Sequence, residues 1–299
     1  MKLNNDKKSL IFALGAVALW STVASAFKIS LRGLSFAQLL FFASATSTCV
    51  LFVIIQFQKK TSAKQIFALS KFPRNALLGF INPFLYYLIL FKAYSLLPAQ
   101  EAQAVNFTWP IAIAILSAIV FKQKMKINTV IGMLIAFSGV FVIITKGHFS
   151  NISFSSFWGD LLALSSAFVW AAFWVINLKD KRESTVKLFG AFLFGTIYTA
   201  IYVGIFDSFF IAEKIYIIGA IYAGLFEMGI TFFLWLKALE LSSNKAKTST
   251  LAYLSPFISF MIIAVVLKEK ILLSSIIGLV LIIGGIFFQH FNIKLFRFK

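Results

Sequence analysis

The sequence predicts an all-α integral membrane protein of ten transmembrane helices, arranged as two inverted five-helix repeats. The 299 residues are 60% hydrophobic and only 13% charged, which is too little charge to cover the surface of a soluble domain. The apolar runs are continuous and about 20 residues long, the length that crosses a hydrocarbon core of about 30 Å. Because a chain in lipid must satisfy its backbone hydrogen bonds internally, each run is expected to be a helix.

The expected spans follow one another with short connections that leave no room for a soluble domain. Their ranges are 9–30, 36–58, 75–96, 99–120, 128–146, 156–178, 186–208, 214–240, 246–267 and 272–292. The first run is expected to be a retained helix and not a signal peptide, because it is long and lacks a small-residue cleavage pattern. The halves 1–148 and 149–299 hold five spans each and are expected to be the two repeats.

An internal repeat relates residues 80–143 to residues 226–288. The matched pieces are Phe91-Lys92-Ala93 with Leu236-Lys237-Ala238, Pro110 with Pro256, Lys122-Gln123-Lys124 with Lys268-Glu269-Lys270, and Gly132 and Gly139 with Gly278 and Gly285. Since each copy holds an odd number of spans, the two copies must enter the membrane in opposite orientations. Inverted repeats of this kind are typical of secondary transporters.

The net charge of +18 is distributed unevenly along the chain. If the N-terminus is cytoplasmic, most of the 28 Lys and Arg residues fall in the two terminal segments and in the loops on the same side. The positive-inside rule therefore predicts that both termini are cytoplasmic. This distribution argues against nucleic acid as a partner and indicates contact between the basic loops and lipid headgroups.

Four sequence pieces carry a family resemblance that covers nearly the whole chain. They are Trp20-Ser21-Thr22, Val105-Asn106-Phe107-Thr108-Trp109-Pro110, Gly159-Asp160-Leu161 through Trp170-Ala171, and Tyr253-Leu254-Ser255-Pro256-Phe257. With them the chain resembles the EamA-type ten-helix branch of the drug/metabolite transporter superfamily, and its first two pieces look most like the aromatic-amino-acid exporters. The resemblance implies a central cavity lined by the first, third, fourth, sixth, eighth and ninth spans. It also implies a peripheral pair formed by the fifth and tenth spans, where Gly132, Gly139, Gly278, Gly284 and Gly285 would permit close packing.

Glu227 is expected to be the acidic residue in the middle of a span, and its partner in the repeat is Asn82. A charge at this depth costs at least about 2.5 kcal/mol, so the side chain should face the interior of the bundle. Thr231 and Trp235, one and two turns further on, can share its helix face. Three roles fit Glu227: binding a substrate ammonium group, carrying a coupled proton, or making a structural hydrogen bond to a neighbouring helix.

A second polar and aromatic stripe is expected in the fourth span, where Gln103, Asn106 and Trp109 are spaced by one turn. Tyr253 belongs to the corresponding stripe of the ninth span. Pro110 and Pro256 should bend these two helices and act as hinges, although membrane helices also tolerate proline without such a role.

Two further groups of residues have alternative interpretations. Trp20 and Trp170, like Trp109 and Trp235, either line the cavity or sit at the membrane interface. Lys92 and Lys237 occupy equivalent positions near opposite membrane faces, where they either extend toward headgroups or close gates by pairing with Glu101 and Glu240.

These features predict a secondary transporter that exports a small metabolite, an amino acid or another amine-bearing compound, across a bacterial inner membrane by alternating access. ATP is not the expected energy source, because the sequence has no Gly-rich phosphate loop ending in Lys-Ser or Lys-Thr. The alternatives are a flippase for a lipid-linked substrate and an importer of S-adenosylmethionine or a nucleobase. An enzyme, a cofactor and a metal site are not expected, since His148 and His290 lie far apart near span ends. Both a monomer and a homodimer are compatible with the sequence.

Overall fold

The computed structural model describes residues 4–58, 71–122, 125, 127–148, 155–177, 180 and 182–289, and these residues form helices and connections without a β-strand. The helical elements are α1 (Asn5–Ser30), α2 (Phe36–Gln58), α4 (Phe72–Gly79), η2 (Phe80–Leu85), α5 (Tyr86–Leu96), α6 (Ala99–Asn106), α7 (Trp109–Val120), α8 (Ile127–Ile144), α9 (Phe157–Asn177), α10 (Ser184–Phe206), α11 (Tyr216–Ala223), η3 (Gly224–Gly229), α12 (Ile230–Leu241), α13 (Lys245–Thr250), η4 (Leu251–Leu254), α14 (Ser255–Val266) and α15 (Leu273–Phe288).

Nine helical segments of the described residues are long and apolar enough to cross a membrane. They are Asn5–Ser30, Phe36–Phe57, Phe72–Leu96, Ala99–Val120, Ile127–Ile144, Phe157–Asn177, Ser184–Phe206, Tyr216–Leu241 and Thr248–Val266. The tenth predicted range contains the shorter apolar helix Leu273–Phe288. Its 16 residues rise about 24 Å, which is less than the thickness of a typical hydrocarbon core. The end of this predicted range, residues 290–292, lies outside the described residues.

Four of these spans are interrupted. The segments Phe72–Leu96 and Tyr216–Leu241 each contain a π-helical stretch, η2 and η3 respectively. The segment Ala99–Val120 breaks between α6 and α7, just before Pro110, and the segment Thr248–Val266 tightens into the 3₁₀ turn η4 just before Pro256. Both prolines therefore lie in the first turn of the helix that follows the break, where no backbone hydrogen bond is lost.

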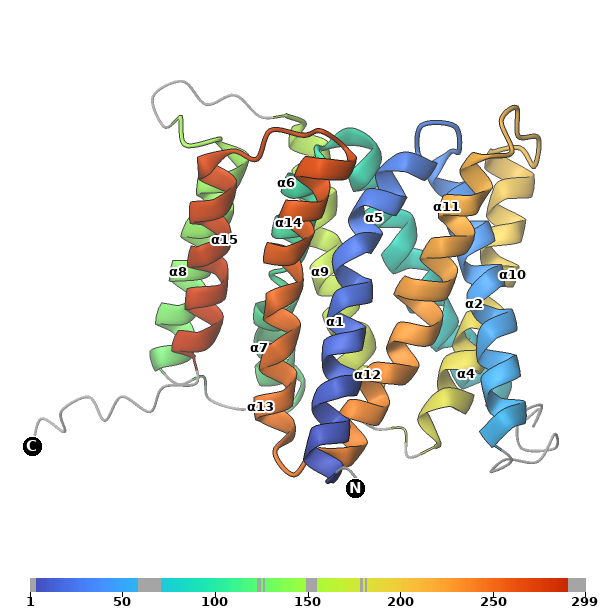
Figure 1. Cartoon of the computed structure of the whole chain (residues 1–299), viewed down its shortest axis with the longest axis horizontal. Helices are drawn as coiled ribbons and strands as arrows, with labels where there is room; N and C mark the ends of the chain where they lie inside the picture. Colours follow the sequence, from blue (N-terminus) through green and yellow to red (C-terminus); the bar gives the residue numbers. More distant parts are fainter. Residues whose placement is uncertain are drawn as a thin grey trace, which may run out of the picture.

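The helices stand side by side along a common direction, with α8 and α15 at one edge and α2 and α10 at the other (Figure 1). Between these edges, α1 packs against α12, α14 and α11, while α9 packs against α5, α7 and α6. Both α1 and α9 are therefore packed against helices that come from the opposite half of the chain. This central region holds most of the side chains predicted to form the site.

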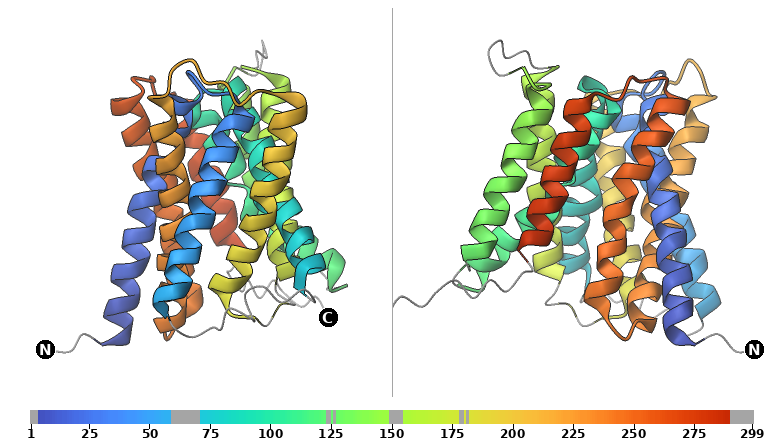
Figure 2. Two further views of the ribbon diagram at one scale, coloured as in Figure 1. Left: turned by 90° about the vertical axis from the view of Figure 1, so that its right-hand side faces the viewer. Right: turned by 60° about the vertical axis from the view of Figure 1, so that its left-hand side comes forward.

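Helices α8 and α15 form a pair at the edge of the bundle, as Figure 2 shows from a second side. A Cβ atom on Gly132 would lie 2.4 Å from the backbone oxygen of Gly285, and one on Gly139 would lie 2.5 Å from that of Gly278. The two backbones thus touch at both glycine pairs, which is the arrangement expected for the fifth and tenth spans. Gly284 was expected to contribute to this packing but does not, because a Cβ there would meet no described atom within 4 Å.

Candidate functional site

Glu227 lies in η3, the π-helical break between α11 and α12. Its carboxylate accepts a hydrogen bond of 3.1 Å from the hydroxyl group of Tyr87 on α5, and the side chain is half-buried. Gly224 at the start of η3 allows α2 to approach, since a Cβ at this position would lie 2.4 Å from the backbone oxygen of Ala43. The break and the close packing together place a carboxylate within the bundle and give it a donor from the other half of the chain.

Asn82, the repeat partner of Glu227, lies in the matching π-helical break, η2. Its backbone leaves the helical region, with φ −148° and ψ 121°, and its side chain is fully buried. Neither atom of its amide group has a hydrogen-bond partner among the described residues. The two polar positions that the repeat relates therefore occupy equivalent breaks, and π-helical segments of this kind are frequent at functional sites.

A row of aromatic rings extends from Tyr87 through the centre of the bundle. We call it the aromatic wall; in order along the row, its members are Tyr87, Tyr86, Trp170, Phe232, Trp20 and Trp235. The successive ring centroids are 4.5, 4.7, 5.9, 6.2 and 5.3 Å apart. The rings come from α5, α9, α12 and α1, so both halves of the chain contribute to one continuous aromatic surface beside Glu227.

Asn106 joins this group through Tyr86. The Tyr86 hydroxyl donates to the side-chain oxygen of Asn106 over 3.4 Å, and the Asn106 amide donates to the Ser166 hydroxyl at 2.8 Å. These contacts connect α5, α6 and α9. Gln103, one turn earlier, is buried, and its side-chain oxygen has no partner in the described part of the chain.

Trp109 and Tyr253 lie in a separate aromatic group. Each packs against Phe107, with ring centroids 6.2 Å and 6.3 Å apart, and Tyr253 also contacts Phe287 at 5.4 Å. No ring contact among the described residues joins this group to the aromatic wall. The sequence stripe from Asn106 to Trp109 is thus divided, because the break before α7 falls between these two residues.

Thr231 has a different role from the one its spacing suggested. It is fully buried, and its hydroxyl donates a hydrogen bond to the backbone oxygen of Phe226. A π-helical break frees backbone carbonyl groups, so this hydroxyl satisfies one of the groups released in η3. The described contact of Thr231 therefore stabilises the segment that carries Glu227 and does not involve the carboxylate itself.

The two predicted gate pairs also differ from expectation. Lys237 forms an ion pair with Glu240 at 2.5 Å, but both residues lie three apart on α12, so the pair does not join two helices. Lys92 and Glu101 form no ion pair within the described residues. The Lys92 ammonium lies 4.9 Å from the ring centroid of Phe36, and Glu101 accepts a hydrogen bond from the Ser155 hydroxyl.

Tyr86 and Tyr87 are the site residues that sequence reasoning missed. The chain contains 8 tyrosines against 37 phenylalanines, and two of these tyrosines stand together in the middle of a span. A buried phenol needs a hydrogen-bond partner. A tyrosine pair at this depth was therefore the available signal for a polar group on a neighbouring helix.

The described residues form nine apolar spans, four of which are interrupted at matched positions, and an interior carboxylate lies at one of these breaks. These features define a multi-pass membrane protein of the transporter class. The model of the EamA-like transporter family matches residues 7–145 and again residues 157–289. The chain belongs to the EamA-like transporter family, and the predicted membership of the drug/metabolite transporter superfamily is confirmed at this level.

Relatives named as transporters agree with this family, and a solved structure shares the fold. A protein of Archaeoglobus fulgidus named "Uncharacterized transporter" is 26% identical over 94% of this chain and 98% of its own length. "Uncharacterized transporter YoaV" of Bacillus subtilis is 23% identical over 95% of this chain and 97% of its own length. A solved structure titled "Crystal structure of protein" matches the fold with a TM-score of 0.66 and 19% identity, covering 94% of this chain and 96% of that one.

Proposed function

We propose that this protein is a secondary transporter that exports a small amine-bearing metabolite, such as an amino acid, across a bacterial inner membrane by alternating access. The observation that carries this proposal is the interior carboxylate of Glu227, held at 3.1 Å by Tyr87 and bordered by the aromatic wall. A carboxylate and aromatic faces together attract an ammonium group, by charge and by cation–π interaction. Glu227 then binds the substrate ammonium group in one state and a proton in the other.

The aromatic wall supports a substrate that also carries an apolar or aromatic part. The rings of Tyr86, Trp170 and Phe232 pack against one another in the bundle interior, and an apolar group that reaches them can pack against them at modest cost in conformational freedom. The Trp-Ser-Thr and Asn-Phe-Thr-Trp-Pro pieces point the same way, through their likeness to the aromatic-amino-acid exporters. Asn106, held between Tyr86 and Ser166, is the candidate polar group for the remainder of the substrate.

The proposed mechanism is the movement of two inverted repeats, 1–148 and 149–299, around a fixed central site. The family model matches once in each half, which supports the two repeats. The matched breaks η2 and η3, and those before Pro110 and Pro256, resemble the discontinuous helices that surround transporter binding sites. The beginning of α1 and the end of α15 lie at the same end of the bundle (Figure 1), which supports an even number of crossings. The positive-inside rule then favours the cytoplasm for both termini.

Counterflow in proteoliposomes tests this proposal, with a panel of amino acids, polyamines, S-adenosylmethionine and nucleobases. We expect counterflow of an amine-bearing compound, and a loss of about 30-fold or more in Glu227→Gln, because removing one partner of a desolvated charge pair costs about 2–5 kcal/mol. Glu213→Gln, in an exposed connection, is the matched control and should transport normally. Undiminished counterflow by folded Glu227→Gln at every pH would contradict the proposal.

A further inference from the structure

A second pair of buried carboxyl groups lies far along the chain from Glu227, where α6 and α9 begin. Glu101 is in the first turn of α6 and Asp160 is in the first turn of α9, and these two helices pack against each other. The residues are only 4% and 6% exposed, so both side chains are more than nine-tenths buried. One carboxyl group comes from each half of the chain, so a movement that separates α6 from α9 also separates the two carboxyl groups.

The hydrogen bonds of this pair leave most of its oxygen atoms without a donor. Glu101 Oε2 accepts the Ser155 hydroxyl at 2.6 Å, whereas Glu101 Oε1 and both oxygens of Asp160 receive no donor from the described residues. The carboxyl group of Glu101 lies close enough to interact with the carboxyl group of Asp160. Two ionised carboxylates are acceptors only, so a hydrogen bond between them requires that one of them carries a proton.

No nearby cation among the described residues forms an ion pair with these carboxyl groups that would compensate the charge of two ionised groups. Lys146 acts on both carboxyl groups through space, but neither Glu101 nor Asp160 is in an ion pair within the described residues. The carboxylate of Glu269, in the connection between α14 and α15, repels Glu101 and accepts the backbone N–H of Ala99 at 3.1 Å. Burying two charged and unpaired carboxylates side by side would cost several kcal/mol for each ion.

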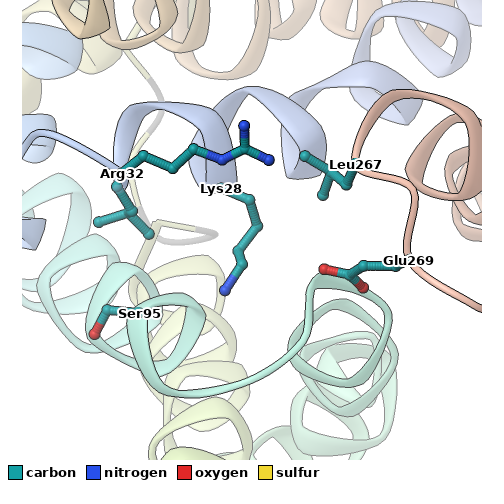
Figure 3. A pocket seen from close by; sticks show the side chains of 6 residues that line it. Lys28, Arg32, Ser95, Leu267 and Glu269 are labelled. Carbon is teal, nitrogen blue, oxygen red and sulfur yellow. The ribbon is translucent and has the colours of Figure 1, made fainter.

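Lys28, a cation that lines the same cavity as Glu269, already has hydrogen-bond partners. Glu269 and Lys28 point into a common cavity of about 170 Å³ (Figure 3). The Lys28 ammonium donates to the backbone oxygens of Tyr94 and Leu97, at 2.8 Å each. Lys28 therefore supports the end of α5 and the approach to α6, and no hydrogen bond or ion pair among the described residues joins it to Glu101 or Asp160.

We propose that Glu101 and Asp160 form a proton-binding site, separate from Glu227, in which the two carboxyl groups hold one shared proton. Separation of α6 from α9 exposes both groups to water, and the proton then leaves as both ionise. Reassembly of the pair takes the proton up again. This inference goes beyond the proposed function, since it concerns a second site and does not depend on the identity of the substrate.

Infrared spectroscopy of the purified full-length protein tests the site without any transport assay. The background is Glu227→Gln, which removes the central carboxyl group. We expect a band from a protonated carboxyl C=O group at neutral pH that shifts in D₂O and disappears in the further variants Glu101→Gln and Asp160→Asn. In each of these variants the remaining carboxyl group accepts a hydrogen bond from the new amide and can ionise. Glu213→Gln, in an exposed connection, should leave the band unchanged.

Two outcomes overturn the inference: absence of a protonated carboxyl band at neutral pH, and persistence of that band in either folded variant. Size-exclusion chromatography identifies folded material. Either substitution by itself removes one of the two carboxyl groups that share the proton, so one folded variant is sufficient for the test. Failure of the proposed transport function is measured separately, as undiminished counterflow in Glu227→Gln. Such a failure does not change the interpretation of the infrared band.

Discussion

Tyr87, in the first half of the chain, donates a hydrogen bond to the carboxylate of Glu227 in the second half. Tyr87→Phe keeps the aromatic ring and removes the hydroxyl that donates to the carboxylate at 3.1 Å. A hydrogen bond to a charged group contributes about 1.5–3 kcal/mol, so we expect counterflow of the substrate to fall by about tenfold or more. The measurement is initial counterflow in proteoliposomes with matched amounts of folded protein.

Tyr202→Phe is the matched control for this substitution. Tyr202 lies on α10 at the edge of the bundle and packs against Phe36, Phe84 and Phe206 through its ring. Its loss of a hydroxyl should leave transport unchanged. Equal reductions in the two variants would mean that the effect of Tyr87→Phe is general and does not arise at Glu227.

Individual site residues were accessible from the sequence where a physical cost singled them out. Glu227 was identifiable because a carboxylate at bilayer depth is energetically costly and is therefore expected to have a function. Asn82 was identifiable because the repeat relates it to Glu227. The contact between Tyr87 and Glu227 was not, since the residues are 140 apart and pairing across helices has no local signal. For the same reason the sequence could not decide whether Lys92 pairs with Glu101, and no ion pair joins them among the described residues.

At the scale of helices, apolar length predicted the spans closely but predicted their interruptions only in part. Pro110 and Pro256 marked two breaks, and Pro83 lies within a third, η2. The fourth, η3, contains no proline; it is bounded by Gly224 and Gly229. Glycine permits a break without forcing one, so this interruption depends on tertiary packing against α2.

The α8–α15 pair offers a test of helix packing. Gly139→Ala places a methyl group 2.5 Å from the backbone oxygen of Gly278, so the helices must separate. Overpacking of this kind typically costs about 1–3 kcal/mol, and we expect a lower Tm in detergent. Gly284→Ala meets no described atom within 4 Å and should keep or raise the Tm, by a gain in helix propensity of up to about 1 kcal/mol. Equal effects of the two substitutions would contradict close contact between these helices.

At the scale of the whole molecule, the two halves are joined by polar contacts at both ends of the bundle. At one end, the Gln38 side chain on α2 donates to the backbone oxygens of Ser208 and Phe210, at 2.6 and 3.1 Å. At the other, Asp180 and Arg182 before α10 contact the beginning of α4 through Arg74 and Asn75. These contacts join α2 and α4 of the first half to the segments on either side of α10 in the second half.

The Asp180 contacts give the molecule a pH-dependent stability that can be measured. Burial alone would raise the pKa of the Asp180 carboxyl group, but hydrogen bonds from Arg182 and the charges of Arg182 and Arg74 outweigh it and lower the pKa to about 2, from an ordinary 3.8. A carboxyl group whose pKa is lowered by folding stabilises the folded state above its unfolded pKa, and this contribution is lost as the pH falls toward the folded pKa. Asp180→Asn should therefore destabilise the protein at pH 7 by about 2 kcal/mol.

The same comparison at lower pH separates this effect from a general packing defect. We expect the difference in Tm between the unsubstituted protein and Asp180→Asn to be constant near neutral pH, to shrink below pH about 4, and to vanish near pH 2. Glu213→Gln, in the exposed connection before α11, should show no such pH-dependent difference. A gap in Tm for Asp180→Asn that stayed the same from neutral pH down to pH 2 would mean that the carboxylate charge does not join α4 to the segment before α10.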